Sequence, residues 1–184
     1  MSFIETEIKG LKIVAPPVFN DDRGYFYEAY SKKIFAEAGI DTEFVQDNQA
    51  RSTYGVLRGL HYQIEPYTQA KLVRVIEGTV LDVVVDLRLK SPTYGKSYAV
   101  ELSVENKRQL FVPRGFAHGY IVLSPTAEFF YKCDNYYSKA HEGGVYYNDP
   151  QLAIDWKLDP SEIILSEKDS LLPKLGDHIG TFQF

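Results

Sequence analysis

The sequence predicts an all-β protein of the jelly-roll type, built as a sandwich or barrel. Short runs rich in β-branched and aromatic residues recur along the chain, and turn-forming residues separate them at intervals of roughly ten residues. Only one segment has the apolar spacing and the end signals of a helix. A chain of 184 residues can form one well-buried domain, and no linker rich in Pro, Gly or Ser divides it. We therefore expect residues 1–184 to form a single domain.

The composition and net charge exclude several classes of partner. The formal net charge is -5, the pI is near 5.4, and Lys and Arg form no cluster, so we expect no general nucleic-acid binding. Cys133 is the only cysteine, which makes an intramolecular disulfide impossible. The first residues lack the basic-then-apolar pattern of a secretion signal, and no apolar run approaches the length of a membrane span. We therefore expect a cytoplasmic protein with no membrane partner.

The first thirty residues are expected to contain two strands. Residues 3–19 alternate in their first part and end in Pro16-Pro17, which predicts one strand leading into an extended turn. Residues 20–24 form a polar turn, and residues 25–30 alternate so that one face of the next strand is aromatic.

The next two segments are a helix and a polar stretch. Residues 31–40 predict a short helix, with Ser31 at its N-cap and Gly39 as its C-terminal stop. Residues 44–52 are polar after their start and fit either a loop or an edge strand. On residue types alone, the interpretation of their amide side chains as turn formers is favoured.

Residues 70–88 are dense in β-branched side chains and are broken once, at Glu77-Gly78. This pattern predicts two paired strands joined by a hairpin turn. Alternation places Lys71 on one face and Arg74 on the other, so neither face is purely apolar. One of these faces is expected to line a cavity.

The region that follows is predicted to be mostly strands. Residues 96–103 alternate as a strand, and residues 109–124 form an apolar strand that Pro113 and Gly115 interrupt just before His118. A lone histidine is more often a structural residue than a functional one, but this one follows a chain-reversing Pro-x-Gly.

The last strand and the tail complete the chain. Residues 127–138 alternate so that Phe129, Tyr131 and Cys133 point to the same side. A core tyrosine whose hydroxyl bonds a backbone carbonyl is the simpler interpretation of Tyr131 on this pattern alone. Residues 141–184 are rich in Pro and Asp with little periodicity, and we expect them to wrap the barrel irregularly.

Residues 55–78 are the strongest candidate for a functional site. They set Arg58, His61 and Lys71 among apolar residues that favour the inside of a sheet. Burying such cations is costly unless each has a partner or a ligand. The chain has no glycine-rich phosphate loop, CxxC or GxSxG motif, so a nucleotide cofactor is not expected.

A series of short motifs runs through the whole chain. They are residues 23–28, 46–48, 57–63, 69–73 and 112–119, followed by Tyr131, Tyr137 and residues 148–156 and 165–169. Each motif alone is a weak signal, but their joint order and spacing resemble the dTDP-4-dehydrorhamnose 3,5-epimerase family.

The resemblance implies a cupin-type jelly-roll barrel that forms a homodimer. It also implies epimerisation of dTDP-4-dehydro-6-deoxy-D-glucose at C3 and C5 to the L-sugar precursor of rhamnose. The C4 ketone acidifies the hydrogens on both neighbouring carbons, and reprotonation of the enolate from the opposite face inverts each centre. Such chemistry needs a base, an opposing acid and an oxyanion stabiliser, but no cofactor.

The same resemblance implies roles for particular residues. His61 is the base, held and made more basic by Asp169, Tyr131 is the acid on the other face, and Lys71 stabilises the enolate oxygen. Tyr137 stacks on the thymine. The full set of implied substrate contacts is Arg23, Glu28, Gln46, Asp47, Asn48, Arg58, Lys71, His118, Tyr137, Glu142 and Lys168.

Three alternatives remain open on the sequence. One is a mono-epimerase that inverts only C3 or C5 of a related sugar. Another is a metal-dependent cupin, since Pro113-x-Gly115-x-x-His118 matches the second cupin motif, although His61 lacks the His-x-His pattern and Lys71 would lie near the metal. The third is a non-catalytic carbohydrate-binding module. A base, an acid and an enolate-stabilising cation together favour an enzyme.

Overall fold

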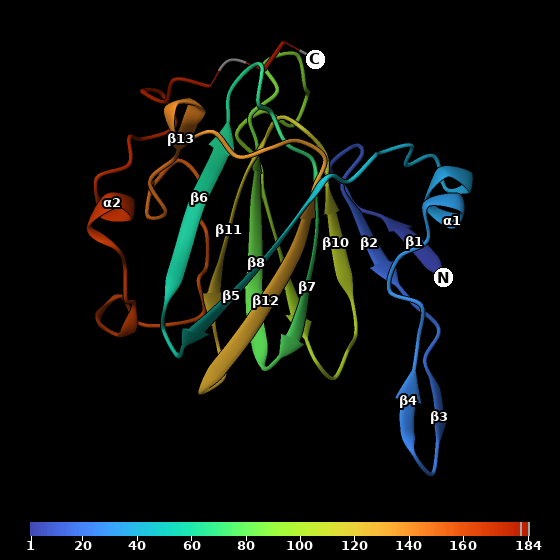
Figure 1. The fold of residues 1–184 in the computed structure, drawn as a ribbon. Coiled ribbons are helices and arrows are strands. Elements are labelled where there is room, and N and C mark those ends of the chain that lie inside the picture. Colours follow the sequence, from blue (N-terminus) through green and yellow to red (C-terminus); the bar gives the residue numbers. More distant parts are fainter. Residues whose placement is uncertain (181, 184) are drawn as a thin grey trace.

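Two antiparallel sheets face each other in the computed structural model, which describes residues 1–180, 182 and 183 (Figure 1). One sheet has six strands in the order β1 (Ser2–Glu5), β2 (Lys12–Ala15), β10 (Gln109–Val112), β7 (Lys71–Glu77), β12 (Thr126–Cys133) and β5 (Gln46–Thr53). The other has five, in the order β13 (Glu142–Gly144), β6 (Leu57–Gln63), β11 (Phe116–Val122), β8 (Thr79–Asp86) and β9 (Ser97–Ser103). This arrangement confirms the predicted all-β jelly-roll fold.

The predicted hairpin within residues 70–88 is wrong. Strand β7 lies in the six-stranded sheet and β8 in the five-stranded sheet, so the chain crosses between the sheets at Gly78. A Cβ at this position, where φ is +77°, would lie 2.1 Å from the Thr126 carbonyl oxygen, so the crossing requires glycine. The turn signal predicts a reversal but not the sheet that the second strand joins. Val73 of β7 and Val84 of β8 point into the same core between the sheets, each from its own sheet, so the pairing of the two sheets buries both side chains.

The N-terminal region also differs from the expectation. Residues 3–19 contain β1 and β2, which pair antiparallel across a turn near Gly10 (φ +88°), as well as the start of β3 (Phe19–Asp21). Strand β4 (Gly24–Phe26) ends earlier than the predicted strand over residues 25–30 and pairs only with β3. This hairpin projects away from the sandwich (Figure 1).

The predicted helix is confirmed as α1 (Lys32–Glu37), with Ser31 at the N-cap position and Gly39 at φ +79°. Residues 44–52 are mostly the edge strand β5, so the favoured interpretation as turn formers is wrong. The side chains of β5 alternate between partly covered and exposed positions, as a strand on the rim of a cavity requires.

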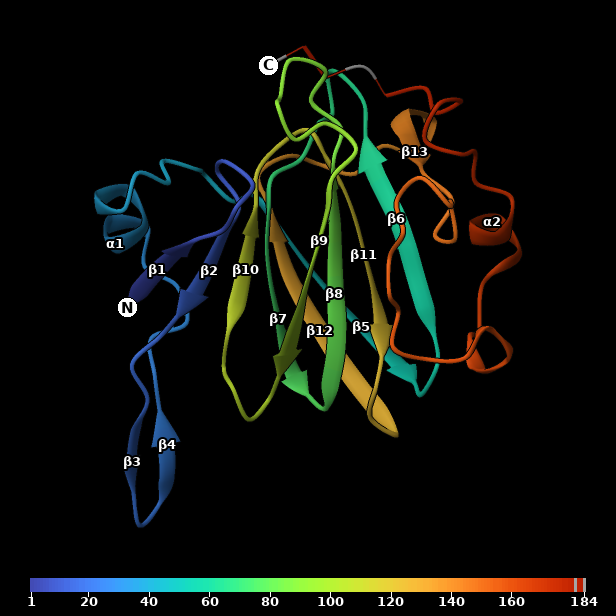
Figure 2. The same ribbon diagram turned by 180° about the vertical axis from the view of Figure 1, so that it is seen from behind.

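Apolar side chains fill two main cores. The first lies between the sheets and includes Val73, Leu102 and Phe129, all at most 1% exposed. The second lies on the outer face of the five-stranded sheet, where the C-terminal segment covers it with residues such as Trp156 and Leu175 (Figure 2). The expectation that the tail wraps the barrel is therefore confirmed, except at Thr181 and Phe184, which lie outside the described residues.

The tail also carries short helical turns. These are η1 (Lys139–His141), η2 (Pro160–Glu162) and α2 (Glu167–Ser170), and α2 lies beside β6 (Figure 1). Within the part of the chain that the structure describes, no helix has the length and apolar character needed to cross a membrane.

Candidate active site

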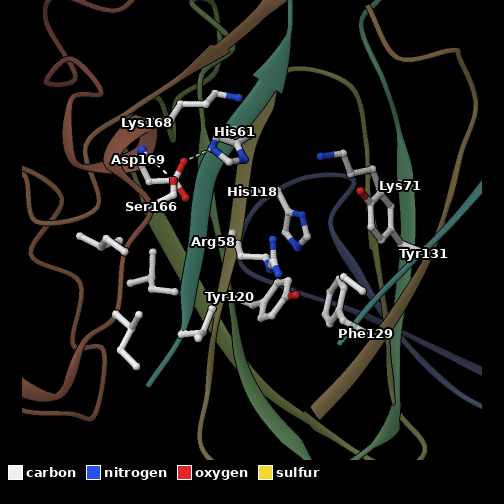
Figure 3. Close-up of a pocket in the computed structure, with 16 residues that line it drawn as sticks. Arg58, His61, Lys71, His118, Tyr120, Phe129, Tyr131, Ser166, Lys168 and Asp169 are labelled. Atoms are coloured by element: carbon white, nitrogen blue, oxygen red, sulfur yellow. Dashed lines mark hydrogen bonds and ion pairs between the residues drawn. The ribbon is translucent and has the colours of Figure 1, made fainter. Parts of the chain in front are cut away.

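A cavity of about 480 Å³ lies between the two sheets (Figure 3). Strands β6 and β11 form one wall, β7 and β12 form the other, and the segment around α2 closes one side. The polar side chains on its walls include Arg58, His61, Lys71, His118, Tyr131 and Asp169. The structure therefore brings together all four residues that the sequence predicts to be catalytic.

Two glycines bring β6 and β11 unusually close. A Cβ at Gly59, where φ is +124°, would lie 2.6 Å from the Gly119 Cα, so only glycine fits this contact. The close approach places His61 directly opposite His118 in the strand register. The two imidazoles thus stand side by side on one wall.

His61 is held by a buried carboxylate. Its Nε2 lies 2.7 Å from Asp169 Oδ1, and the Gly59 N–H reaches the other carboxylate oxygen at 3.5 Å. Burial raises the pKa of Asp169, but the hydrogen bonds from His61, Gly59 and Ser166 outweigh burial and hold it below the usual range. Because Nε2 is directed at the ionised carboxylate, the other ring nitrogen, Nδ1, faces the cavity (Figure 3). This is the arrangement of a general base.

Tyr131 occupies the opposite wall. It extends from β12 with its hydroxyl in the cavity, across from His61 (Figure 3). Burial, together with neighbouring Cys133, raises the pKa of Tyr131 to about 12. The phenol is therefore protonated at neutral pH, as a proton donor must be.

Lys71 supplies a positive charge beside Tyr131. Its ammonium lies 5.8 Å from the centre of the Tyr131 ring, and no ion pair of the described residues includes it. Burial lowers the pKa of Lys71, while Cys133 and the carboxylates of Asp82 and Glu142 act against that change. A cation without a close counter-ion in a cavity is suited to stabilise an oxyanion.

His118 and Arg58 stand on the same wall as His61. His118 Nε2 lies 2.9 Å and 3.1 Å from the two oxygens of the buried Asp82, which fixes the ring. Arg58 Nε donates to Ser52 Oγ at 3.1 Å. Both predicted contact residues therefore line the cavity in defined orientations.

A second cleft of about 390 Å³ adjoins the first at Tyr131, which lines both. Gln46, Asn48, Gln69 and Tyr137 complete its lining, and the Tyr137 ring is 53% exposed. This cleft contains three of the residues predicted to contact the nucleotide sugar.

The rim above His61 is a chain of polar contacts. The Tyr137 hydroxyl donates to Glu142 at 2.8 Å, and the Lys168 ammonium lies 2.5 Å from the other carboxylate oxygen. Burial raises the pKa of Glu142, but Lys168 and Tyr137 outweigh it and lower that pKa overall. The three predicted contact residues are thus joined at the mouth of the cavity.

Three predicted contact residues lie elsewhere in the single chain. Arg23 and Glu28 are exposed in and just after the projecting hairpin, and Arg23 pairs with Asp21. Asp47 points to the exposed face of β5, where Lys132 binds it at 2.9 Å. Their roles stay predictions.

Sequence reasoning missed Tyr120, which lines the cavity from β11. Tyr120 comes two residues after His118, so the alternation of a strand places both side chains on the same face. The sequence therefore contained a signal that could have predicted Tyr120 in the cavity. The role of Ser166 was also missed. Its hydroxyl accepts a hydrogen bond from the Asp169 N–H at 3.1 Å and so caps the N-terminus of α2. Within the described residues, no three His, Cys, Asp or Glu side chains gather as a metal-binding group.

Replacing Asp169 by Asn should lower kcat about 100-fold or more, because the amide does not supply the charge that stabilises protonated His61. Steady-state kinetics measure the loss. Asp155→Asn is the matched control and should leave kcat unchanged, since this exposed carboxylate pairs with Lys157 away from the cavity. Equal activity of the Asp169 variant and the control would contradict the assigned role.

The jelly roll with a His–Asp pair facing a tyrosine across a cavity defines an acid–base enzyme with a cupin-type fold. The family model of dTDP-4-dehydrorhamnose 3,5-epimerase matches residues 5–177. The chain belongs to this family.

Individual relatives agree with the family match. The dTDP-4-dehydrorhamnose 3,5-epimerase of Shigella flexneri is 54% identical over 170 residues, which cover 92% of this chain and 93% of that protein. A crystal structure of dTDP-4-dehydrorhamnose 3,5-epimerase from Elizabethkingia anophelis has a TM-score of 0.93 and 56% identity, covering 96% and 97% of the two chains.

A second solved structure contains a ligand. It is dTDP-6-deoxy-D-glucose-3,5-epimerase from Legionella pneumophila in complex with dTDP-4-keto-L-rhamnose. The TM-score is 0.92 and the identity 51%, over 96% of this chain and 93% of that one.

Proposed function

We propose that this protein epimerises dTDP-4-dehydro-6-deoxy-D-glucose at C3 and C5 to dTDP-4-dehydro-L-rhamnose, in dTDP-L-rhamnose biosynthesis. The observation that carries the proposal is the opposition of two proton-transfer groups across one cavity. His61 with Asp169 stands on one wall and Tyr131 on the other. Inversion at carbon requires removal of a proton from one face and delivery to the other.

The mechanism follows from this geometry. His61 Nδ1 takes the proton from the carbon next to the C4 ketone, and the electron pair moves to the ketone oxygen. The Lys71 ammonium stabilises the resulting enolate oxygen. Tyr131 then donates its proton to the opposite face of the carbon, and exchange with solvent restores both groups. The same cycle at the other neighbouring carbon completes the reaction, and no redox cofactor is needed because no electrons leave the sugar.

The nucleotide part of the substrate fits the mouth of the cavity. We place the thymine against the exposed Tyr137 ring in the second cleft, which adjoins the sugar cavity at Tyr131. Gln46 and Asn48 line this cleft, and Lys168 stands at the rim of the sugar cavity beside His61. Local cations explain how an acidic protein binds a diphosphate.

We also propose that the active form is a homodimer. The hairpin of β3 and β4 exposes Phe19 at 63% and Phe26 at 71%, and it projects too far from its own cavity to contribute to it (Figure 1). A partner subunit would cover these rings. Arg23 would then lie at the diphosphate site of the partner, and Glu28 would lie nearby. We assign the dimer, with one domain per chain, to the cytoplasm.

A mixing experiment tests the contribution of the hairpin across subunits. The Arg23→Ala and His61→Ala variants should each be nearly inactive alone. When the two are mixed and their subunits allowed to exchange, half of the dimers are mixed, and each of these has one intact site. Activity should recover to about a quarter of the wild-type value. No recovery, with exchange verified by mass spectrometry, would show that Arg23 does not act in the partner's site.

The proposed reaction is tested by proton NMR of the product formed from dTDP-4-dehydro-6-deoxy-D-glucose. Ring-proton coupling constants and nuclear Overhauser contacts should together show inverted configuration at both C3 and C5. Unchanged substrate would refute the proposed function, and inversion at a single carbon would make the protein a mono-epimerase.

A further inference from the structure

The Tyr120 hydroxyl is a buried polar group that the mechanism above does not use. The residue lies on β11, is 5% exposed and lines the same cavity as His61 and Tyr131. Its hydroxyl points toward the space between the two walls (Figure 3). No hydrogen-bond partner of ordinary geometry exists for this hydroxyl among the described residues. Buried hydroxyls in native proteins almost always have a partner, so this one calls for a ligand.

The neighbours of Tyr120 hold its ring but do not satisfy its hydroxyl. The ring stacks on Phe129 with 4.1 Å between centroids and 16° between planes. Arg58 and Ser52 lie close enough to the hydroxyl to lower its pKa by hydrogen bonding, but neither contact has the geometry of an ordinary hydrogen bond. Burial raises the pKa of Tyr120, against the effect of Ser52 and Arg58, so the hydroxyl keeps its proton and can donate it.

The positions of His61 and Tyr131 on the two cavity walls determine which part of the substrate reaches Tyr120. The reacting carbons must lie between His61 and Tyr131, so the hexose fills this cavity while the nucleotide remains at the rim near Tyr137. A hexose carries hydroxyl and ring oxygens around its edge, and each can accept a hydrogen bond.

We propose that Tyr120 is a further substrate-binding residue, whose hydroxyl donates a hydrogen bond to an oxygen of the bound hexose. This inference rests on the proposed function, because it needs the hexose to occupy the cavity. The bond sets the depth and tilt of the sugar ring, so that C3 and C5 both come within reach of His61. It also selects nucleotides that carry a hexose over the bare nucleotide.

The Tyr120→Phe variant tests the proposal, because it removes one oxygen and keeps the ring stacked on Phe129. We compare the affinities for dTDP-glucose, which carries an unreactive hexose, and for dTDP, which has none, by calorimetry. The affinity for dTDP-glucose should fall about three- to tenfold, the size expected for one neutral hydrogen bond, while the affinity for dTDP stays unchanged. The kcat/KM for the keto sugar should fall by at least the same factor.

Stability separates this role from a structural one. Because the hydroxyl makes no hydrogen bond of ordinary geometry with the described residues, Tyr120→Phe should not lower the melting temperature. The matched control is Tyr62→Phe, whose hydroxyl accepts the Gly180 N–H at 3.1 Å in the outer core. That variant should melt at a lower temperature and keep the wild-type ratio of the two affinities.

The outcomes are distinct. A wild-type affinity ratio in Tyr120→Phe would overturn the proposal, as would an equal loss of affinity for dTDP and dTDP-glucose. If the wild-type protein fails to turn over the keto sugar, the proposed function falls. The binding ratio still decides the role of Tyr120 in that case, because it does not depend on turnover.

Discussion

His61→Ala is expected to abolish turnover of the keto sugar and to leave dTDP binding largely intact. His61 lines the cavity with the buried carboxylate of Asp169 behind its ring, and its other ring nitrogen faces the cavity opposite Tyr131. General bases contribute about 10²- to 10⁴-fold, and both inversions use this one, so kcat should fall at least about 1,000-fold. Rapid-quench assays measure the loss, and calorimetry with dTDP measures binding.

Removing the imidazole also leaves the buried Asp169 carboxylate with one partner fewer, which lowers stability. His61→Asn is therefore made in parallel, because its amide can still donate toward Asp169 but is not a base. His178→Gln replaces an imidazole that does not line the cavity and should retain wild-type kcat. Activity near the wild-type level in a folded His61 variant would remove His61 as the base.

Tyr131→Phe should uncouple proton removal from inversion. His61 can still abstract the proton and return it to the same face, but the opposite wall then has no donor. In deuterated water, the substrate should gain deuterium with retained configuration, while the rate of inverted product falls about 100-fold or more. Mass spectrometry follows the exchange, and NMR follows the configuration.

A second tyrosine provides the control for this variant. Tyr98 lies on β9, is partly buried against the core between the sheets and does not line the cavity. Tyr98→Phe should form inverted product at the wild-type rate. If Tyr131→Phe does the same, a different group must deliver the proton.

Local patterns predicted the strands well but not how they assemble into sheets. Alternation correctly placed Phe129, Tyr131 and Cys133 on one side of β12, because the period of two is a local property of a strand. Alternation in residues 70–88 was also correct, yet the two strands lie in different sheets. Sheet membership depends on burial across the whole core, which a turn signal does not specify.

The pairing of His61 with Asp169 was not visible in local sequence at all. The two residues lie 108 positions apart, and α2, which carries Asp169, comes from the irregular tail. Before the structure, only the resemblance to the family implied that these two residues form a pair. The position of Tyr120 in the cavity, by contrast, can be predicted from the strand period once His118 is known to line it. The roles proposed for Arg23 and Glu28 require a second subunit, which no pattern within one chain describes.

The most direct test of the account is proton NMR of dTDP-4-dehydro-6-deoxy-D-glucose in deuterated water with the wild-type protein and a chelator. We expect product with inverted configuration at C3 and C5 and deuterium at both carbons, because His61 and Tyr131 exchange their protons with solvent between steps. Inversion at one carbon only, inversion without deuterium, or loss of activity on adding the chelator would contradict it.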